Sequence, residues 1–398
     1  IIRTTSGGYI ALGDRFYQNG FGMCIVNFDS NGNILWEKST EELEHISATS
    51  IIQTFDGNYA ISGYSDSIDS FGNGEFFIAK IDLYGNFLWN NTFGVQGHDI
   101  YGEALTQTAD GGYVIVGEIY SDENETYSYN AICMKTDANG NLQWSKTYGE
   151  DFNYCLAIDV ISLSDGYIIG GIVEEYNETS ADSSESLWLI KTDLNGDLLW
   201  EKKYVSYDSC SFGSLIQTTT GKYVLAANFQ SGGIHRGVVL IQTDAQGNIL
   251  WNQTIIRSTV DDNYRFHATS LIQTLDGGCA IGGYGMTRQI IDEEDVNFFY
   301  QQSIIKTNAQ GTLTWMKNYT DGLATVTHLL QDNDGGYVLI GYVAETDSSH
   351  IFINIVKTSV NGEVGIAWTS LTENNIILYR GESDPYWNYV RVRIWIAK

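Results

Sequence analysis

Relatives of one ten-residue string, KTDANGNLQW at residues 135–144, recur along the chain and constrain its fold more than any other feature. Each copy ends on a tryptophan, and consecutive tryptophans are 51 to 64 residues apart. A repeat of this length is typical of a unit of supersecondary structure that buries its apolar face by stacking on its neighbours. The tryptophans that end the copies are Trp36, Trp89, Trp144, Trp200, Trp251, Trp315 and Trp368.

Two further strings precede each copy. One resembles ADGGYVIVG (109–117), and before it comes an apolar run such as TSIIQT (49–54). These segments are 4–8 residues long, rich in Ile, Val, Tyr and Thr, and lack helical periodicity, so each repeat reads as four short strands. We therefore predict an all-β fold in which residues 1–370 form a seven-bladed β-propeller of four-stranded antiparallel blades. A solenoid or a pair of β-sandwiches is the alternative.

The recurring string itself predicts a tight hairpin turn. Asp137 occupies the first position of the turn and can accept backbone N–H groups, while Gly140 supplies a positive φ. A calcium loop is the competing interpretation, but an EF-hand has its glycine at position six and a glutamate at position twelve. The closing tryptophans are expected to pack between neighbouring sheets rather than to form a binding cage.

Composition excludes some classes of partner. The formal net charge is −28, with 21 basic and 49 acidic residues, which argues against a nucleic-acid partner. No apolar run approaches the length of a transmembrane helix. The chain opens inside a repeat, so we expect a removed or missing N-terminal segment.

Several positions are candidates for polar or chemical roles. If the first strand of each blade is innermost, a polar ring lines a channel; its members are Arg3, Gln53, Gln107, Ser162, Gln217, Gln273 and Gln331. Cys155 and Cys210 occupy the same repeat position and are either bonded or, as we favour, small core residues. The loops between the second and third strands are acidic, and two of them, 118–129 and 298–300, are rich in tyrosine.

Five sequons make candidate glycosylation sites, all at expected strand ends or loops. They are Asn90, Asn124, Asn177, Asn252 and Asn318.

The repeat ends after Trp368, and residues 371–398 are expected to form a separate two-strand extension. Its last strand alternates apolar residues with polar or aromatic ones and is basic on an acidic chain. It either covers the edge of its own last blade or pairs with a neighbouring molecule. The assembly candidates are Tyr389, Val390, Arg391, Val392, Arg393, Ile394, Trp395 and Ile396.

With its SIIQTxDGGYxIxGY and KTDxxGNxxW units, the chain resembles secreted β-propeller repeat proteins of archaea and bacteria. The tail string YWNYVRVRIW (386–395) looks like a C-terminal module of archaeal members. The resemblance implies a propeller fold and an extracellular, cell-surface location, and it carries over no site residues.

These observations lead us to expect a non-enzymatic structural or adhesive surface protein that assembles with itself into a filament or array through its tail. The alternative is a module that binds a glycan or a peptide through the acidic, tyrosine-rich loop face. No motif marks a catalytic, cofactor-binding or metal-ligating residue. We therefore expect no enzyme activity and no cofactor, with another copy of the chain or a surface glycan or protein as the partner.

Overall fold

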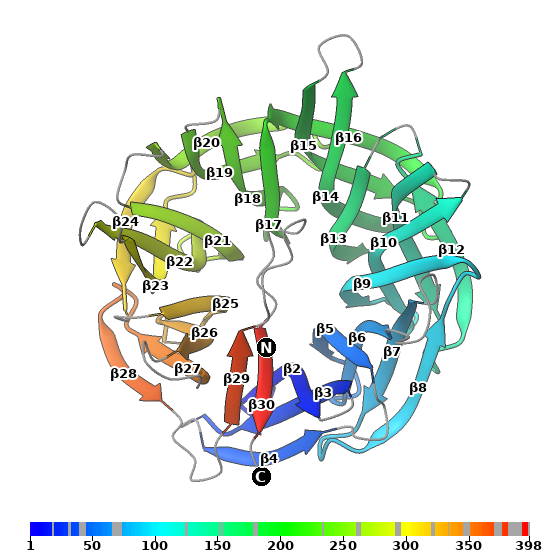
Figure 1. Ribbon diagram of the computed structural model, residues 1–398, viewed down its shortest axis with the longest axis horizontal. Coiled ribbons are helices and arrows are strands. Elements are labelled where there is room, and N and C mark those ends of the chain that lie inside the picture. The colour runs from blue at the N-terminus through cyan, green and yellow to red at the C-terminus, as the bar shows by residue number, and fades with distance from the viewer. Residues whose placement is uncertain are drawn as a thin grey trace. The chain divides into compact units, whose positions relative to one another are not determined.

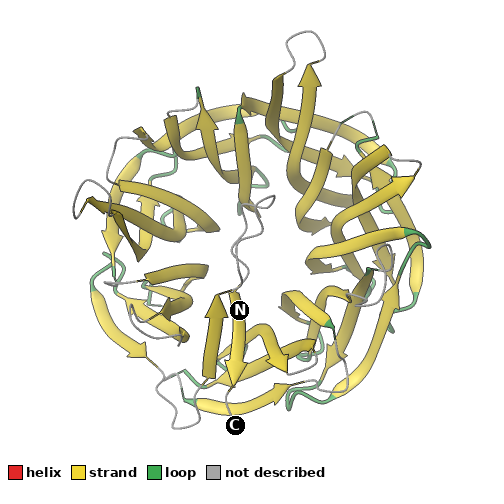
Figure 2. Cartoon of the chain, in the orientation of Figure 1, coloured by secondary structure: helices red, strands yellow, loops and turns green. Residues whose placement is uncertain are grey.

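The computed structural model describes residues 1–17, 20–30, 33–39, 45–65, 74–123, 126–150, 152, 154–177, 182–232, 235–259, 264–290, 296–319, 323–332, 334–344, 351–369, 376–380 and 392–396. These residues form β-strands and their connections, without a helix (Figure 2). Consequently, no helix able to cross a membrane occurs in the described part of the chain.

The chain divides into two compact units, and each is described by itself. Unit 1 contains residues 1–182, 188–201 and 372–398, and unit 2 contains residues 183–187 and 202–371. The tail therefore groups with unit 1.

Unit 1 begins with two sheets. The first contains β1 (Ile2–Arg3), β2 (Tyr9–Tyr17), β3 (Gly20–Phe28), β4 (Ile34–Ser39), β29 (Ile376–Arg380) and β30 (Val392–Ile396). The second contains β5 (Ile46–Gln53), β6 (Tyr59–Ser65), β7 (Glu75–Ile81) and β8 (Phe87–Phe93). Strands β5 to β8 pair in chain order, each antiparallel to the next (Figure 1).

The next two sheets are linked by a one-residue parallel bridge between Tyr129 and Tyr154. One contains β9 (His98–Gln107), β10 (Tyr113–Glu123), β11 (Thr126–Thr136) and β12 (Leu142–Tyr148). The other contains β13 (Tyr154–Leu163), β14 (Gly166–Asn177), β15 (Asp182–Thr192) and β16 (Leu198–Tyr207). The boundary between the two units crosses β15 and β16.

Unit 2 contains three more sheets of the same order. They are β17 (Ser209–Gln217), β18 (Tyr223–Ser231), β19 (His235–Thr243) and β20 (Ile249–Thr259); β21 (Tyr264–Gln273), β22 (Cys279–Ile290), β23 (Val296–Thr307) and β24 (Leu313–Asn318); and β25 (Leu323–Gln331), β26 (Tyr337–Ala344), β27 (Ile351–Thr358) and β28 (Val364–Thr369). The all-β fold with four antiparallel strands per repeat is thus as the sequence predicts.

The recurring string forms the turn between the third and fourth strands. Asp137 Oδ1 accepts the backbone N–H groups of Asn139 and Asn141, each at 2.9 Å, and Asp137 Oδ2 accepts the Asn141 side chain. Gly140 has φ +81°, a backbone conformation that costs glycine little. Asp82 and Asp244 make the same contacts in their repeats. The acidic residue therefore closes a hairpin.

The closing tryptophans pack on the next repeat. A Cβ atom built on Gly140 would lie 2.5 Å from the Trp89 ring, and the Trp36 indole donates to the Leu83 carbonyl at 3.0 Å. The pairs of tryptophan and turn glycine are Trp36 with Gly85, Trp89 with Gly140, Trp144 with Gly196, Trp251 with Gly311 and Trp315 with Gly362. For these tryptophans the predicted packing between sheets is confirmed.

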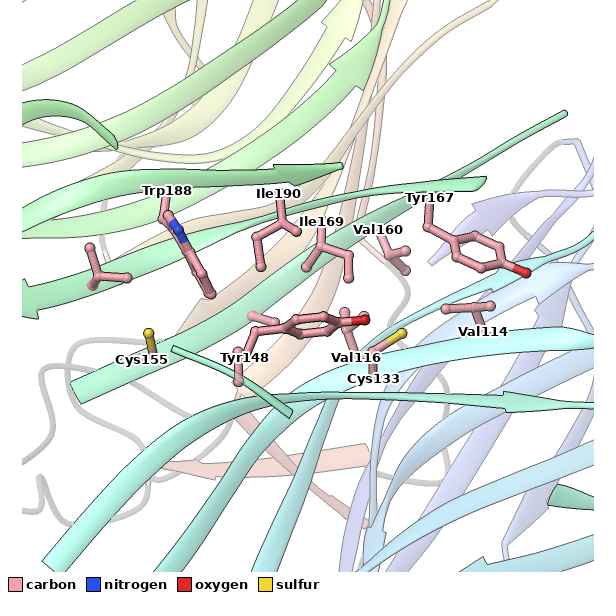
Figure 3. Packing of buried hydrophobic residues seen from close by; sticks show 13 residues of the cluster. Val114, Val116, Cys133, Tyr148, Cys155, Val160, Tyr167, Ile169, Trp188 and Ile190 are labelled. Carbon is pink, nitrogen blue, oxygen red and sulfur yellow. The ribbon is translucent and has the colours of Figure 1, made fainter. Parts of the chain in front are cut away.

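The apolar cores also lie between consecutive sheets. Figure 3 shows one of them as two facing rows of side chains. One row contains Val114, Val116, Cys133 and Tyr148, and the other contains Val160, Tyr167, Ile169, Trp188 and Ile190. Each sheet therefore buries its apolar side chains against its neighbour, as the repeat length implies.

The glutamines of the expected polar ring hold neighbouring turns together. Gln107 Oε1 accepts the Phe55 N–H of the preceding repeat at 2.8 Å, while its Nε2 donates to the Gly111 carbonyl of its own turn at 3.1 Å. Gln53, Gln273 and Gln331 accept the corresponding N–H groups of Thr5, Thr219 and Leu275. We call this contact the glutamine bridge.

Ion pairs connect strands within a repeat. Lys135 is 3% exposed and pairs with Asp110 of the turn between the first two strands at 3.0 Å. Equivalent pairs are Lys80 with Asp56, Lys191 with Asp165, Lys306 with Asp276 and Lys357 with Asp334, and Lys357 also pairs with Asp332.

Two of the expected loops between second and third strands are strand where the structure describes them. Residues 118–123 belong to β10 and residues 126–129 to β11, and the two strands pair from Glu118 with Ala131 out to Glu123 with Thr126. Similarly, β22 and β23 pair as far as Ile290 with Val296. The prediction of loops there was wrong because hairpin ladders continue wherever both arms supply β-forming residues.

Candidate functional site

A bulge in the first strand of the sheets creates a distinctive position. In β5, β9, β13, β17, β21 and β25 the register with the second strand shifts by one residue. The residues left without a partner are Thr49, Glu103, Ile158, Gly213, Thr269 and Thr327. Bulges re-aim side chains and are frequent next to active sites.

Glu103 differs from the threonines that occupy this bulge position in other repeats. Thr49 Oγ1 donates to the Gly102 carbonyl at 2.7 Å, and Thr269 Oγ1 donates to the Val326 carbonyl at 2.6 Å, so each threonine binds the following sheet. β9 carries a carboxyl group at the same point. Glu103 is partly buried.

A second carboxyl group lies on the adjacent strand. Glu118 in β10 pairs with Tyr101 of β9 and is only 8% exposed. The Tyr154 hydroxyl of β13 donates to Glu118 Oε2 at 3.3 Å. The equivalent second-strand positions hold Tyr64 and Tyr284 in other repeats, paired with Ser47 and His267. Together we call Glu103, Glu118 and Tyr154 the carboxyl site.

Both carboxyl groups hold their protons unusually strongly. Burial, with a smaller contribution from the Glu118 charge, raises the pKa of Glu103 from 4.5 to about 8. Burial also raises the pKa of Glu118 from 4.5 to about 7, although the hydrogen bond from Tyr154 acts in the opposite direction. Desolvation disfavours a carboxylate, and a second carboxylate nearby adds repulsion. At neutral pH the pair therefore holds both a proton donor and a partly ionised acceptor.

The backbone around the carboxyl site is packed without spare room. Cβ atoms built on Gly102 and Gly117 would lie 2.9 and 3.0 Å from ring atoms of Phe76, a side chain with no solvent exposure. The ring of Tyr101 contacts Tyr64 edge-on with centroids 5.1 Å apart. These contacts hold the strands that carry both carboxyl groups in place. Catalytic groups require such rigid support.

A comparable polar cluster in unit 2 is structural. The Asn228 side chain accepts the Ala268 N–H at 2.7 Å and donates to the Ala268 carbonyl at 3.0 Å. His267 stacks on Tyr284 with centroids 5.0 Å apart, and burial lowers its pKa to about 4. Asn228 thus ties β18 to β21, and its hydrogen bonds are used within the protein.

The glycosylation and cysteine candidates predicted from the sequence are not part of the carboxyl site. Asn90, Asn252 and Asn318 are exposed, and Asn318 Oδ1 also accepts the Ser303 hydroxyl at 2.7 Å. Asn177 ends β14, and Asn124 lies outside the described residues. Nothing in the structure tests their glycosylation. Cys155 and Cys210 are both buried free thiols.

The assembly candidates fall partly on β30. Tyr389, Val390 and Arg391 lie outside the described residues; Val392, Arg393, Ile394, Trp395 and Ile396 form the strand. β30 pairs antiparallel with β29 and parallel with β2 of the same chain, through Asp14 with Arg393 and Arg15 with Ile394. A role in assembly remains a prediction.

The carboxyl site was not predicted from the sequence. Its signal was present in the repeat alignment, since a glutamate replaces a residue that is threonine in three other bulges. No group of three or more possible ligands for a metal ion occurs among the residues whose placement is described.

Comparisons with known proteins locate the fold. No family model matches the chain. No curated protein matches it either. Among solved structures, an ulvan lyase of polysaccharide lyase family 25 bound to a glucuronate–rhamnose sulfate saccharide has a TM-score of 0.55 at 9% identity, covering 93% of this chain and 94% of that one. A puromycin hydrolase mutant has a TM-score of 0.55 at 8% identity, covering 95% of this chain but 56% of the hydrolase.

These likenesses show a propeller-like all-β fold. They also contradict the expectation of a non-enzymatic structural or adhesive protein, because two solved structures that share the fold over most of this chain are a lyase and a hydrolase. We correct that expectation here. Sequence motifs did not reveal the carboxyl site because Glu103 and Glu118 come from two strands of one repeat and Tyr154 from the next, so the site has no contiguous signature.

Proposed function

We propose that the chain is an enzyme that hydrolyses a polysaccharide by general acid–base catalysis at Glu103 and Glu118. The observation that carries the proposal is the pair of neighbouring carboxyl groups with raised pKa values on adjacent strands, of which Glu118 also accepts a hydrogen bond from Tyr154. Two carboxyl groups in different protonation states are what glycoside hydrolysis uses.

The two carboxyl groups take different roles. Glu103, with the higher pKa, is the acid: it gives its proton to the glycosidic oxygen as the bond to the anomeric carbon breaks. Glu118 is the base: it takes a proton from the water molecule whose oxygen forms the new bond to that carbon. The products are two hydroxyl-ended sugars, and solvent then returns the proton from Glu118 to Glu103.

The fold and the similar solved structures are consistent with an enzyme that acts on a polysaccharide. The seven sequence repeats and the four-stranded sheets support a seven-bladed propeller, and the likeness to a polysaccharide lyase supports a scaffold suited to sugar polymers. A polymer too large to enter cells also agrees with the secreted, cell-surface setting that the repeat resemblance implies.

The test measures release of reducing ends from a panel of polysaccharides. Glu103→Gln and Glu118→Gln should each lower kcat by about 10²–10⁴-fold, the usual contribution of general acid–base catalysis. The pH profile of kcat/KM should be narrow, rising as Glu118 ionises near pH 7 and falling as Glu103 loses its proton near pH 8.

Glu363→Gln is the matched control. Glu363 lies in a turn of unit 2 and pairs with Lys317, and it is not part of the carboxyl site, so its variant should keep full activity. Cleavage that persists in both carboxyl variants, or no cleavage of any polymer in the panel, would refute the proposed function.

A further inference from the structure

A row of tyrosine rings leads to the carboxyl site. Tyr120 of β10 lies 4.7 Å from Tyr129 of β11, and Tyr129 lies 5.2 Å from Tyr154 of β13, measured between ring centroids. Tyr154 in turn donates its hydroxyl proton to Glu118. The row is therefore continuous with the groups proposed to act in catalysis.

Strand pairing fixes this row. Tyr120 and Tyr129 are directly opposed in the β10–β11 ladder, and Tyr129 and Tyr154 form the one-residue bridge between β11 and β13. All three side chains are partly buried, so part of each remains open to solvent. A tyrosine ring offers an apolar face with few rotatable bonds, which suits it to packing against the C–H face of a sugar ring.

The charge at the carboxyl site restricts which sugar can bind there. Among the residues that the structure describes, neither Glu103 nor Glu118 forms an ion pair with a lysine or an arginine. A uronate or sulfate group would add negative charge beside these carboxyl groups. Bringing an anion into a desolvated place without a cationic partner is costly.

We infer that the substrate is a glycan without acidic groups, one sugar ring of which packs on Tyr129 and Tyr154 beside Glu118. This inference rests on the proposed function, because it places the glycan at the carboxyl site. It separates this chain from the ulvan lyase that it resembles, whose bound saccharide contains glucuronate and a sulfate.

Binding, measured apart from cleavage, tests the inference. The full chain carrying Glu118→Gln is run in native affinity gels that contain β-glucan, xylan, galactomannan or chitosan, and in gels that contain polygalacturonate, alginate or ulvan. At least one polymer of the first group should retard the protein, and none of the acidic group should.

Variants on this background identify the row as the binding surface. Tyr129→Ala should weaken binding by about fivefold, because stacking on an aromatic side chain contributes on the order of 1 kcal/mol. Tyr129→Phe, which keeps the ring, should bind normally and reports on folding. Tyr84→Ala, at a tyrosine that is 72% exposed in a turn, is the control.

Each outcome decides between the two proposals. Retardation by acidic polymers alone, by no polymer, or equally in Tyr129→Ala would overturn the inference about the substrate. If an acidic polymer were instead cleaved with loss of activity in Glu103→Gln, the acid–base function would stand and the substrate class would be wrong. If binding depended on Tyr129 but cleavage were unchanged in Glu103→Gln and in Glu118→Gln, the proposed function would be refuted.

Discussion

At the scale of the residue, one glycine of the recurring turn meets two structural requirements. Gly140 adopts φ +81°, and it leaves room for the Trp89 ring of the preceding repeat. The first requirement could be foreseen from the Asp-x-x-Gly string. The second could not, because the sequence does not tell which turn a tryptophan some 50 residues earlier will reach.

Comparing Gly140→Ala with Gly57→Ala separates these two requirements. Gly57 has φ +85°, and a Cβ atom built there meets nothing within 4 Å. Gly57→Ala should cost about 1 kcal/mol for the left-handed backbone alone. Gly140→Ala should cost at least about 2 kcal/mol, because its Cβ also displaces Trp89. Urea unfolding measures both free energies, and equal losses would show that the tryptophan contact is unimportant.

At the scale of the element, the sequence predicted strands better than it predicted how they are joined. Apolar runs and turn residues located the four strands of each repeat. The bulge in the first strand escaped prediction because the residues at its unpaired position, among them Thr49, Glu103 and Gly213, share no chemistry. The carboxyl site was missed for that reason, since its geometry depends on the bulge.

The glutamine bridge makes a prediction at this scale. Gln107→Leu removes the acceptor of the Phe55 N–H and the donor to the Gly111 carbonyl. Because water can partly replace these partners in an exposed turn, the free energy of unfolding should fall by about 1 kcal/mol. Gln246→Leu, at an exposed position in a turn, should change it by less than about 0.5 kcal/mol. A loss as large in Gln246→Leu would mean that the bridge is not the cause.

At the scale of the whole molecule, titrating groups act on stability in opposite directions. Burial tends to raise the pKa of Asp110, but hydrogen bonds from Thr108 and Lys135 outweigh it and lower the pKa from 3.8 to about 2. In the same way, hydrogen bonds from Thr274 and Lys306 outweigh burial and lower the pKa of Asp276 to about 2. Glu103 and Glu118 have raised values, so folding favours their protonated forms.

The resulting pH dependence can be predicted with its sign. The lowered carboxyl groups stabilise the fold above about pH 4, and this contribution is lost as the pH falls toward 2. Glu103 and Glu118 keep their protons in the folded state when the unfolded chain has already lost them, so stability declines from about pH 4.5 to about 8. Urea unfolding between pH 3 and 9 should therefore show a maximum near pH 4–5.

Replacing the two glutamates tests whether they cause the decline in stability between about pH 4.5 and about 8. In a variant with both Glu103→Gln and Glu118→Gln, the decline toward pH 8 should flatten while the acid side stays unchanged. A decline of unchanged steepness would show that other groups are responsible.

The glutamine bridge and the tryptophan contact have an evolutionary consequence. Every junction that they make uses the same donors, acceptors and ring on one repeat and the same turn on the next. A gene segment encoding one whole repeat can then be duplicated or deleted while each remaining junction finds its partners. Individual repeats are also free to diverge at the bulge, which is how a threonine that joins two sheets could give way to an acid.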